Sequence, residues 1–242
     1  MAITTDGFVA ALLESIDGAR RQEQPYRHWY LQRCLPEDAV DAILDLPVPA
    51  PELGGISGKR ELHNAARKYF DVENRAKSSV CEMFCQAFQH RSVTDAIARV
   101  FGSGLGGTYL RVEYAQDTDS FWLEPHTDLG VKKFTMLLYM SRNPQHRTLG
   151  TDMYDKDKKH VGVSPFAPNA AMVFVPSDLT YHGFEPRRIE GVRKSLIINY
   201  VTKEWRAREQ LAFPDQPIAA RDESRRLKRD KRRAAALAET DA

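Results

Sequence analysis

The sequence predicts a mainly β fold with flanking helices, on three observations. The middle of the chain alternates short runs of β-branched and aromatic residues with turns. The segments on either side have helical apolar spacing or a helix-forming composition. At 242 residues the chain can bury one full core but has no room for a second large domain. We therefore divide it into an N-terminal helical region that packs on the core (1–106), a β core (107–202) and a basic helical C-terminal tail (203–242).

The N-terminal region is expected to supply the outer helices and a long loop. Apolar residues recur at helical spacing in residues 7–16, and residues 36–44 begin with a proline and two acids, which favour a helix N-terminus. Further helices are expected over residues 72–88 and 92–100. Proline and glycine between residues 47 and 58 predict a loop that could cover a site, together with the basic and aromatic stretch that follows it.

A glycine cluster at residues 102–107 fits the GxGxxG pattern of dinucleotide sites. That motif requires a strand before it and a helix after it. Here a helix is expected before the cluster and a strand after it, so we predict a helix-to-strand turn instead. Strands of an antiparallel core are expected over residues 109–114, 134–140, 170–175 and 195–201.

The C-terminal tail contains the basic run 225–233. Basic runs near a terminus are commonly solvated, and a net charge of +2 gives no strong field over the whole protein. We therefore do not expect nucleic acid as a partner. We also predict that the chain after Pro214 is dispensable.

Composition also bounds the cell compartment and the redox state. Cys34, Cys81 and Cys85 form no zinc-type CxxC pair, and their odd number suggests no disulfide framework, so we expect reduced thiols. Cys81 and Cys85 lie four apart on one face of an expected helix, where we expect two small buried residues; a metal site or a redox pair is the alternative. No apolar stretch approaches the roughly 18 to 20 residues that span a bilayer. Asp6 and Glu14 interrupt a start that lacks the basic-then-apolar order of a signal peptide. The expected location is the cytoplasm, with no membrane partner.

Three residues of the β core have the types and order of metal ligands. The HxD spacing lets His126 and Asp128 point to the same side of an extended segment. His182 follows an apolar strand near the end of the core. Two imidazoles and one carboxylate suit non-haem Fe(II) and leave positions open for a bidentate cosubstrate and dioxygen. The same donors also suit zinc with an activated water.

A candidate anion site follows the distal histidine. Arg193 stands eleven residues after His182 and precedes Ser195 at the start of an apolar strand. A buried arginine is costly without an anionic partner, and its planar fork matches a carboxylate. Ser195 can add a hydroxyl donor. The arrangement predicts a dicarboxylate ligand.

The order HxD, distal histidine, then RxS resembles that of the Fe(II)- and 2-oxoglutarate-dependent oxygenase superfamily, specifically the branch similar to prolyl 4-hydroxylases. The resemblance covers about residues 107–202 and implies a double-stranded β-helix, or jelly roll. It also implies that His126, Asp128 and His182 hold Fe(II).

The resemblance further implies how the cosubstrate binds. Arg193 and Ser195 match the pair that binds the distal carboxylate of 2-oxoglutarate. Tyr114 resembles a tyrosine that hydrogen-bonds the same cosubstrate, although a core tyrosine explains it nearly as well. The chain departs from the family at residues 149–154, where many relatives have Gly-Gly-Glu-Leu, and in the polar, irregular stretch 141–149. Substrate rules of prolyl hydroxylases are therefore not transferred.

The implied activity is that of a dioxygenase that hydroxylates an unactivated C–H bond and releases succinate and CO2. Because related halogenases lack the carboxylate ligand, Asp128 favours hydroxylation. The alternatives are a zinc hydrolase, in which Arg193 and Ser195 have no evident role, and a non-catalytic jelly-roll metal-binding module. The substrate, a small molecule or a protein side chain, and the oligomeric state have no signature in the sequence. Candidate pocket residues are Arg111, Phe121 and Trp122 near the metal motif, and His63, Asn64, Arg67 and Tyr69 in the loop.

Overall fold

The computed structural model describes residues 2–50, 58, 67–128 and 130–220, and these form two antiparallel sheets with helices. The larger sheet has seven strands in the order β1-β2-β9-β6-β11-β4-β3. Its strands are β1 (Arg20–Gln22), β2 (His28–Gln32), β3 (Lys68–Tyr69), β4 (Tyr109–Asp117), β6 (Lys132–Tyr139), β9 (Ala170–Phe174) and β11 (Arg193–Val201). The smaller sheet has the order β5-β10-β7-β8. Its strands are β5 (Leu123–His126), β7 (Asp152–Tyr154), β8 (His160–Val163) and β10 (His182–Phe184).

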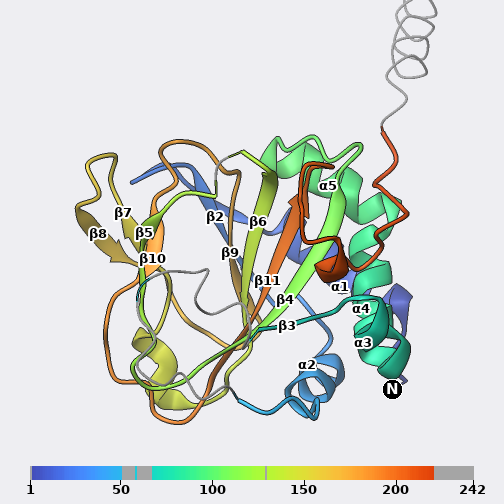
Figure 1. Cartoon of the computed structure of the whole chain (residues 1–242), viewed down its shortest axis with the longest axis horizontal. Coiled ribbons are helices and arrows are strands. Elements are labelled where there is room, and N and C mark those ends of the chain that lie inside the picture. Colours follow the sequence, from blue (N-terminus) through green and yellow to red (C-terminus); the bar gives the residue numbers. More distant parts are fainter. Residues whose placement is uncertain (1, 51–57, 59–66, 129, 221–242) are drawn as a thin grey trace, which may run out of the picture.

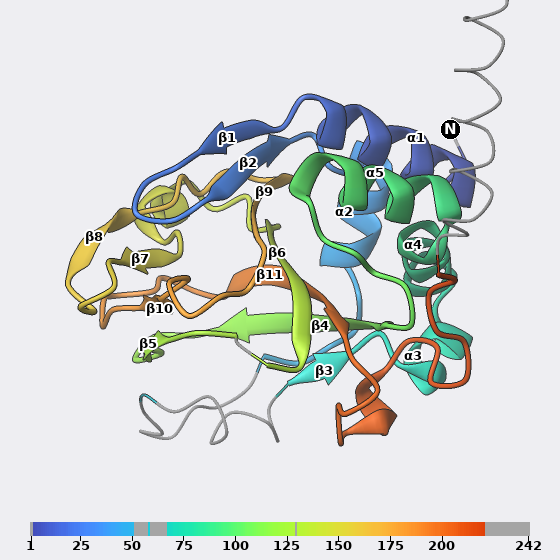
Figure 2. The same ribbon diagram turned by 90° about the horizontal axis from the view of Figure 1, so that it is seen from above.

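Helices cover the face of the larger sheet that is turned away from the smaller sheet (Figure 1). The view from above in Figure 2 shows the same order of helices, larger sheet and smaller sheet. The helices are α1 (Thr5–Asp17), α2 (Glu37–Leu44), α3 (Val72–Lys77), α4 (Ser79–Gln89) and α5 (Arg91–Phe101), with short 3-10 turns η2 (Pro144–Thr148) and η3 (Arg208–Gln210). The predicted mainly β fold with flanking helices is confirmed.

Most elements agree with the sequence-based expectation. The four predicted strands correspond to β4, β6, β9 and β11. The predicted glycine turn is confirmed, because α5 ends at Gly102 in the left-handed conformation, with φ 74°, and β4 follows. The single helix predicted over residues 72–88 is wrong. The extended backbone of Ser78 separates α3 from α4.

The N-terminal region contributes more than helices. β1 and β2 extend the larger sheet beyond β9, and β3 pairs with β4 at the opposite edge. The sequence-based boundary at residue 106 thus divides segments that share one sheet. The three β1 residues are all exposed and show no alternation, so the sequence carried no strand pattern there.

Two layers of buried side chains hold these elements together. The larger cluster lies between the helices and the larger sheet and includes Cys34, Cys81 and Cys85. All three are buried free thiols, which confirms the burial predicted for Cys81 and Cys85. The second cluster joins the larger sheet to Met153 of β7, through residues that include Leu137, Met172 and Phe174. The space between the two sheets therefore contains a hydrophobic cluster of its own, separate from the one under the helices.

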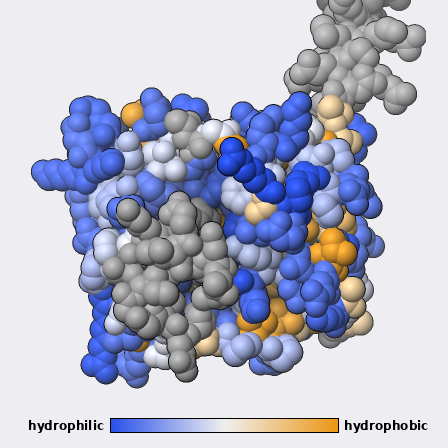
Figure 3. Space-filling view, in the orientation of Figure 1, coloured by the Kyte–Doolittle hydropathy of each residue, from blue (hydrophilic) through white to orange (hydrophobic). Residues whose placement is uncertain are grey.

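Few large hydrophobic side chains stay exposed in the described part of the chain. The face in Figure 3 is largely hydrophilic, with scattered hydrophobic residues. The large hydrophobic side chains that stay exposed in the described part are Val72, Val161, Val163 and Leu179. None of the helices in that part combines the length and the apolar character that a bilayer-spanning segment needs.

The described part of the expected C-terminal tail packs on the core. Within residues 203–220 the helical element is η3 alone, and Phe213 and Ile218 belong to the larger buried cluster. The backbone of Ile218 donates to Thr108 O at 2.8 Å and accepts from Gly107 N at 2.8 Å. The basic run 225–233 lies outside the described residues. This packing argues against the predicted dispensability of the chain after Pro214.

We expect a chain that ends at Pro214 to be less stable than one that ends at Ala220. The shorter chain loses the buried side chain of Ile218 and its two backbone hydrogen bonds, worth about 2 to 4 kcal/mol of unfolding free energy together. Urea unfolding of the two chains measures the difference, with Ile218→Ala in the longer chain as the side-chain control. Identical unfolding midpoints would contradict the docking of this segment.

Candidate metal and anion site

The three predicted metal ligands converge at one end of the smaller sheet. His126 ends β5, and His182 lies directly opposite it on the antiparallel strand β10. Asp128 follows His126 by two residues, and one ligand atom from each of the three residues lies within 4.8 Å of the others. The Nε2 atoms of His126 and His182 are 4.0 and 3.9 Å from the two oxygens of Asp128. Residues far apart in the chain thus form one cluster.

Backbone carbonyls fix the tautomer of both histidines. Nδ1 of His126 lies 2.9 Å from Glu124 O, and Nδ1 of His182 lies 3.0 Å from Thr180 O. A carbonyl oxygen can only accept, so each Nδ1 carries the hydrogen and each Nε2 presents a lone pair. This arrangement is typical of metal-ligating histidines, whose second ring nitrogen donates to a carbonyl or carboxylate.

Asp128 is held by two donors from β6. Lys132 Nζ donates to one carboxylate oxygen at 2.6 Å, and Thr135 Oγ1 donates to the other at 2.9 Å. All three side chains are buried. Lys132 and Thr135 were not predicted from the sequence, because their roles depend on how β6 packs against the segment after β5. Their four- and seven-residue spacing from Asp128 gave no local signal.

The donor set fits Fe(II). Two imidazole nitrogens and one carboxylate lie close together, and this is the donor set of two-histidine, one-carboxylate non-haem iron sites. Gly183 allows β10 to lie close to β5, because a Cβ atom at this position would be only 2.6 Å from Leu123 O. A side chain at this position would push β10 away from β5 and separate the two histidines.

A second cluster of metal-binding residue types lies at Asp152, His160 and Glu185. This cluster differs from the first, because His160 and Glu185 are exposed, none of the three residues lines the cavity, and His160 Nε2 lies 2.8 Å from Asp152 itself, which also accepts from the Arg187 guanidinium. We therefore regard it as a structural ion-pair cluster.

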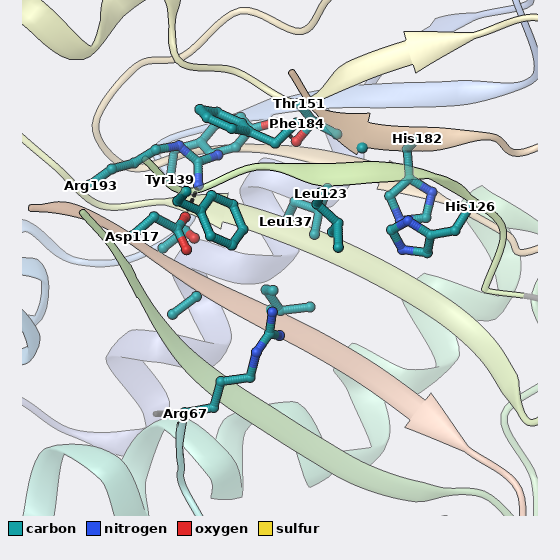
Figure 4. Close-up of a pocket in the computed structure, with 15 residues that line it drawn as sticks. Arg67, Asp117, Leu123, His126, Leu137, Tyr139, Thr151, His182, Phe184 and Arg193 are labelled. Carbon is teal, nitrogen blue, oxygen red and sulfur yellow. Dashed lines mark hydrogen bonds and ion pairs between the residues drawn. The ribbon is translucent and has the colours of Figure 1, made fainter. Parts of the chain in front are cut away.

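A cavity runs from the two histidines to Arg193 between the sheets. In Figure 4, His126 and His182 lie at one end, Arg193 and Asp117 at the other, and Leu123 and Leu137 between them. The other lining residues are Arg67, Ala115, Phe121, Tyr139, Thr151, Gly183, Phe184, Ser195 and Ile197. The cavity therefore has two polar ends and an apolar middle.

Strand register explains this order of polar and apolar side chains. Residues in register on neighbouring strands lie side by side, and alternate residues share a face. Three cross-strand pairs of β6 and β11 follow one another along the sheet from the metal cluster toward Arg193. Thr135 pairs with Asn199 beside Asp128, then Leu137 pairs with Ile197, and then Tyr139 pairs with Ser195. Arg193 and Asp117 pair at the far end.

Arg193 has a partner that the sequence analysis did not foresee. Its NH1 donates to Asp117, and its Nε donates to Leu149 O at 2.7 Å. The guanidinium lies 4.8 Å from the Phe184 ring centroid. The Asp117 carboxylate balances this buried cation within the protein, so the burial of Arg193 does not by itself require an anionic ligand. The remaining N–H groups make no hydrogen bond within the described residues.

The assignment of Tyr114 to the cosubstrate is wrong. Ala115 and Asp117 of β4 line the cavity, so Tyr114 points to the opposite face. There it is 1% exposed and packs against Phe70, with ring centroids 6.3 Å apart. Burial raises the pKa of its hydroxyl. Tyr114 is a core residue on the helical side.

Tyr139 is the tyrosine that lines the cavity. Its hydroxyl lies 2.8 Å from Thr151 Oγ1 and 2.5 Å from Ser164 Oγ, and it is register-paired with Ser195. Ser195 also lines the cavity. The alternation of β6 could have revealed Tyr139, since it lies four residues after Thr135 and so on the same face.

The other pocket candidates divide into two groups. Phe121 and Arg67 line the cavity. Arg111 and Tyr69 do not, because the Arg111 guanidinium stacks 4.7 Å from the Tyr69 ring centroid in a buried polar network. Trp122 also lies elsewhere, with its ring against Gly58. His63 and Asn64 lie outside the described residues.

That polar network connects the metal cluster to the edge of the cavity. Thr135, which donates to Asp128, accepts from Asn199 at 3.0 Å, and Asn199 accepts from Arg111 at 3.1 Å. Arg111 also donates to Glu113 at 2.7 Å, and Glu113 accepts from Arg67 as well. A continuous chain of hydrogen-bonded side chains on the larger sheet thus runs from Asp128 to Arg67, which lines the cavity.

Comparison with known proteins agrees with the predicted resemblance at the level of fold. No protein-family model matches the sequence, and no curated protein is significantly similar to it. Solved structures do match. A prolyl-4-hydroxylase of Pseudomonas putida aligns with a TM-score of 0.51 and 17% identity over 81% of this chain and 94% of that chain.

Two further solved structures are similar. A prolyl hydroxylase of Trichoplax adhaerens, in complex with a peptide fragment of the hypoxia inducible factor oxygen degradation domain, has a TM-score of 0.55 and 12% identity over 84% of this chain and 93% of that one. A 2OG-Fe(II) oxygenase family oxidoreductase of Burkholderia pseudomallei has a TM-score of 0.52 and 13% identity, covering 83% and 91%. This chain therefore has the fold of these oxygenases.

The opposite placement of the two tyrosines predicts different costs of losing a hydroxyl. Tyr139→Phe should lower the free energy of unfolding by about 1 to 3 kcal/mol, because Thr151 and Ser164 lose a buried partner. Tyr114→Phe should change it by less than about 0.5 kcal/mol, because its hydroxyl has no hydrogen-bond partner in the described structure. Chemical unfolding of both variants tests this, and the reverse ranking would refute the assignment.

Proposed function

We propose that this protein is an Fe(II)- and 2-oxoglutarate-dependent dioxygenase that hydroxylates a C–H bond of its substrate. One observation carries the proposal: a metal-ligand cluster and a buried arginine occupy the two ends of a single cavity. An elongated dicarboxylate with a chelating end fits this order of groups. The shared fold with 2OG-Fe(II) oxygenases supports the same function, and we propose that the two sheets form the double-stranded β-helix of that superfamily.

Each group of residues would have a distinct task. His126, Asp128 and His182 would hold Fe(II), with both Nε2 atoms preset by the Nδ1 hydrogen bonds to backbone carbonyls. Lys132 and Thr135 orient the carboxylate of Asp128. Bound Fe(II), 2-oxoglutarate and dioxygen would supply the oxidising chemistry, with release of succinate and CO2.

The remaining lining residues would bind and orient the cosubstrate. Arg193 and Ser195 would donate to its distal carboxylate. Leu137 and Ile197 would pack on its methylene groups and exclude water. Because Asp128 occupies the carboxylate position of the triad, hydroxylation is favoured over halogenation.

The substrate would be a small molecule or a protein side chain. The Trichoplax adhaerens enzyme was solved with a peptide fragment, which makes a peptide group a reasonable first test. A zinc hydrolase is the second candidate, because the same donors suit zinc. The buried Arg193 at the far end of the cavity favours the oxygenase, since hydrolysis at the metal needs no second anion site.

Replacing any one of His126, Asp128 and His182 by Ala should abolish Fe(II)-dependent succinate formation, because two ligands cannot hold the metal in place. Anaerobic Fe(II) binding should weaken in parallel. Circular dichroism should show that the fold is kept. The unfolding midpoint should change little in the two histidine variants and fall in Asp128→Ala, because Lys132 loses its buried partner. Unchanged succinate production by the His182→Ala protein would rule out the triad.

For Arg193→Ala, the free energy of 2-oxoglutarate binding should fall by about 2 to 5 kcal/mol, the range for removing one partner of a buried charge pair. Arg193→Lys should recover part of this loss, since an ammonium cannot form two parallel hydrogen bonds. Titration of the anaerobic Fe(II) protein, followed by its metal-to-ligand absorption band, measures both. Iron affinity serves as the control and should change little. If Arg193→Ala binds 2-oxoglutarate as tightly as the parent, Arg193 does not bind the distal carboxylate.

A further inference from the structure

The anion end of the cavity already contains a carboxylate. Asp117 is 6% exposed, lines the same cavity as Arg193 and accepts from its NH1. Arg193 is the only side chain in the described structure that donates to Asp117. A cosubstrate carboxylate that binds Arg193 would therefore share one guanidinium with Asp117.

The neighbouring charged groups offset this competition only in part. Asp117 on β4 faces Arg193 on β11, with Arg67 and Glu113 as the other charged residues in its surroundings. Arg67 is engaged by Glu113, which also accepts from Arg111. Among these described groups, Arg67 attracts the Asp117 carboxylate from a distance without a hydrogen bond to it.

Two ionised carboxylates at one buried cation repel each other. In a site with little water, the usual outcome is that the pair keeps one proton, as in other buried carboxylate pairs. The protein is prepared for this, because burial raises the pKa of Asp117 even beside Arg193. Protonated Asp117 would no longer oppose a second carboxylate, and its O–H could donate to that carboxylate.

We propose that binding of 2-oxoglutarate takes up one proton from solvent, and that Asp117 holds it beside the distal carboxylate in the Arg193 pocket. The inference rests on the proposed function, because it requires 2-oxoglutarate to occupy this cavity. It makes Asp117 a residue that sets the affinity for the cosubstrate and the pH dependence of that affinity.

The sign of the pH dependence follows from the uptake. Bound 2-oxoglutarate raises the pKa of Asp117 above its value in the free cavity, so binding is strongest at low pH. Above the free-state pKa, affinity falls by up to about tenfold per pH unit until the pKa of the complex is reached. Asp117→Asn removes the titrating group and keeps the shape, so its affinity should not follow this slope. At high pH the variant should bind more tightly than the parent.

Calorimetry tests the proton directly. 2-Oxoglutarate is titrated into the anaerobic Fe(II) protein at neutral pH, in phosphate and in Tris, whose ionisation enthalpies differ widely. The difference in heat between the buffers gives the number of protons taken up. For the parent we expect a value close to one, and for Asp117→Asn a value close to zero. Asp215→Asn, which removes an exposed carboxylate outside the cavity lining, should behave like the parent.

A second ligand isolates the distal carboxylate. 2-Oxopentanoate keeps the chelating 2-oxo acid and lacks the distal carboxylate, so it should bind without proton uptake in every variant. Equal heats for 2-oxoglutarate in the two buffers with the parent protein would overturn the inference, as would undiminished uptake in Asp117→Asn. If the parent binds no 2-oxoglutarate, the proposed function itself fails. Binding without proton uptake refutes the role of Asp117 alone.

Discussion

The antiparallel pairing of β5 with β10 is the constraint on which the site depends. It places His126 opposite His182, although 55 residues separate them in the chain. The pairing requires Gly183, since any side chain there would collide with the Leu123 carbonyl. The carbonyls of Glu124 and Thr180 then direct both Nε2 atoms toward Asp128. One strand pair thus sets the positions and the tautomers of two of the three ligands.

The space between the sheets holds several charges, and each carboxylate there has a cationic partner. Asp128 is paired with Lys132, Asp117 with Arg193, and Glu113 with Arg111. Burying such pairs seldom stabilises a protein relative to apolar packing of the same volume. The pair that lines the cavity, Asp117 with Arg193, is therefore better explained by ligand binding than by stability. The cross-strand pair of Leu137 and Ile197 lines the cavity between its metal-ligand end and its Arg193 end and keeps these two ends apart.

The site residues that could be predicted from the sequence are those that form a recognisable ordered motif. The HxD pair, the distal histidine and the following arginine and serine are recognisable because chemistry restricts their types. Tyr114 was misassigned because its distance from His126 in the sequence does not reveal which face of β4 its side chain is on. In the structure it faces the helices. Asp117, Lys132 and Tyr139 were missed because their roles arise from pairing between strands that are distant in the chain. Likewise, β1 is too short and too exposed to show alternation.

In the function proposed above, the metal cluster and the Arg193 end of the cavity act together on 2-oxoglutarate. The most direct measurement is release of labelled CO2 from carbon 1 of 2-oxoglutarate by the purified protein under air. We predict release and matching succinate with Fe(II), and neither after chelation or with Zn(II) in place of Fe(II). Fe(II)-loaded protein that binds 2-oxoglutarate but releases no CO2, with or without candidate substrates, would contradict the account.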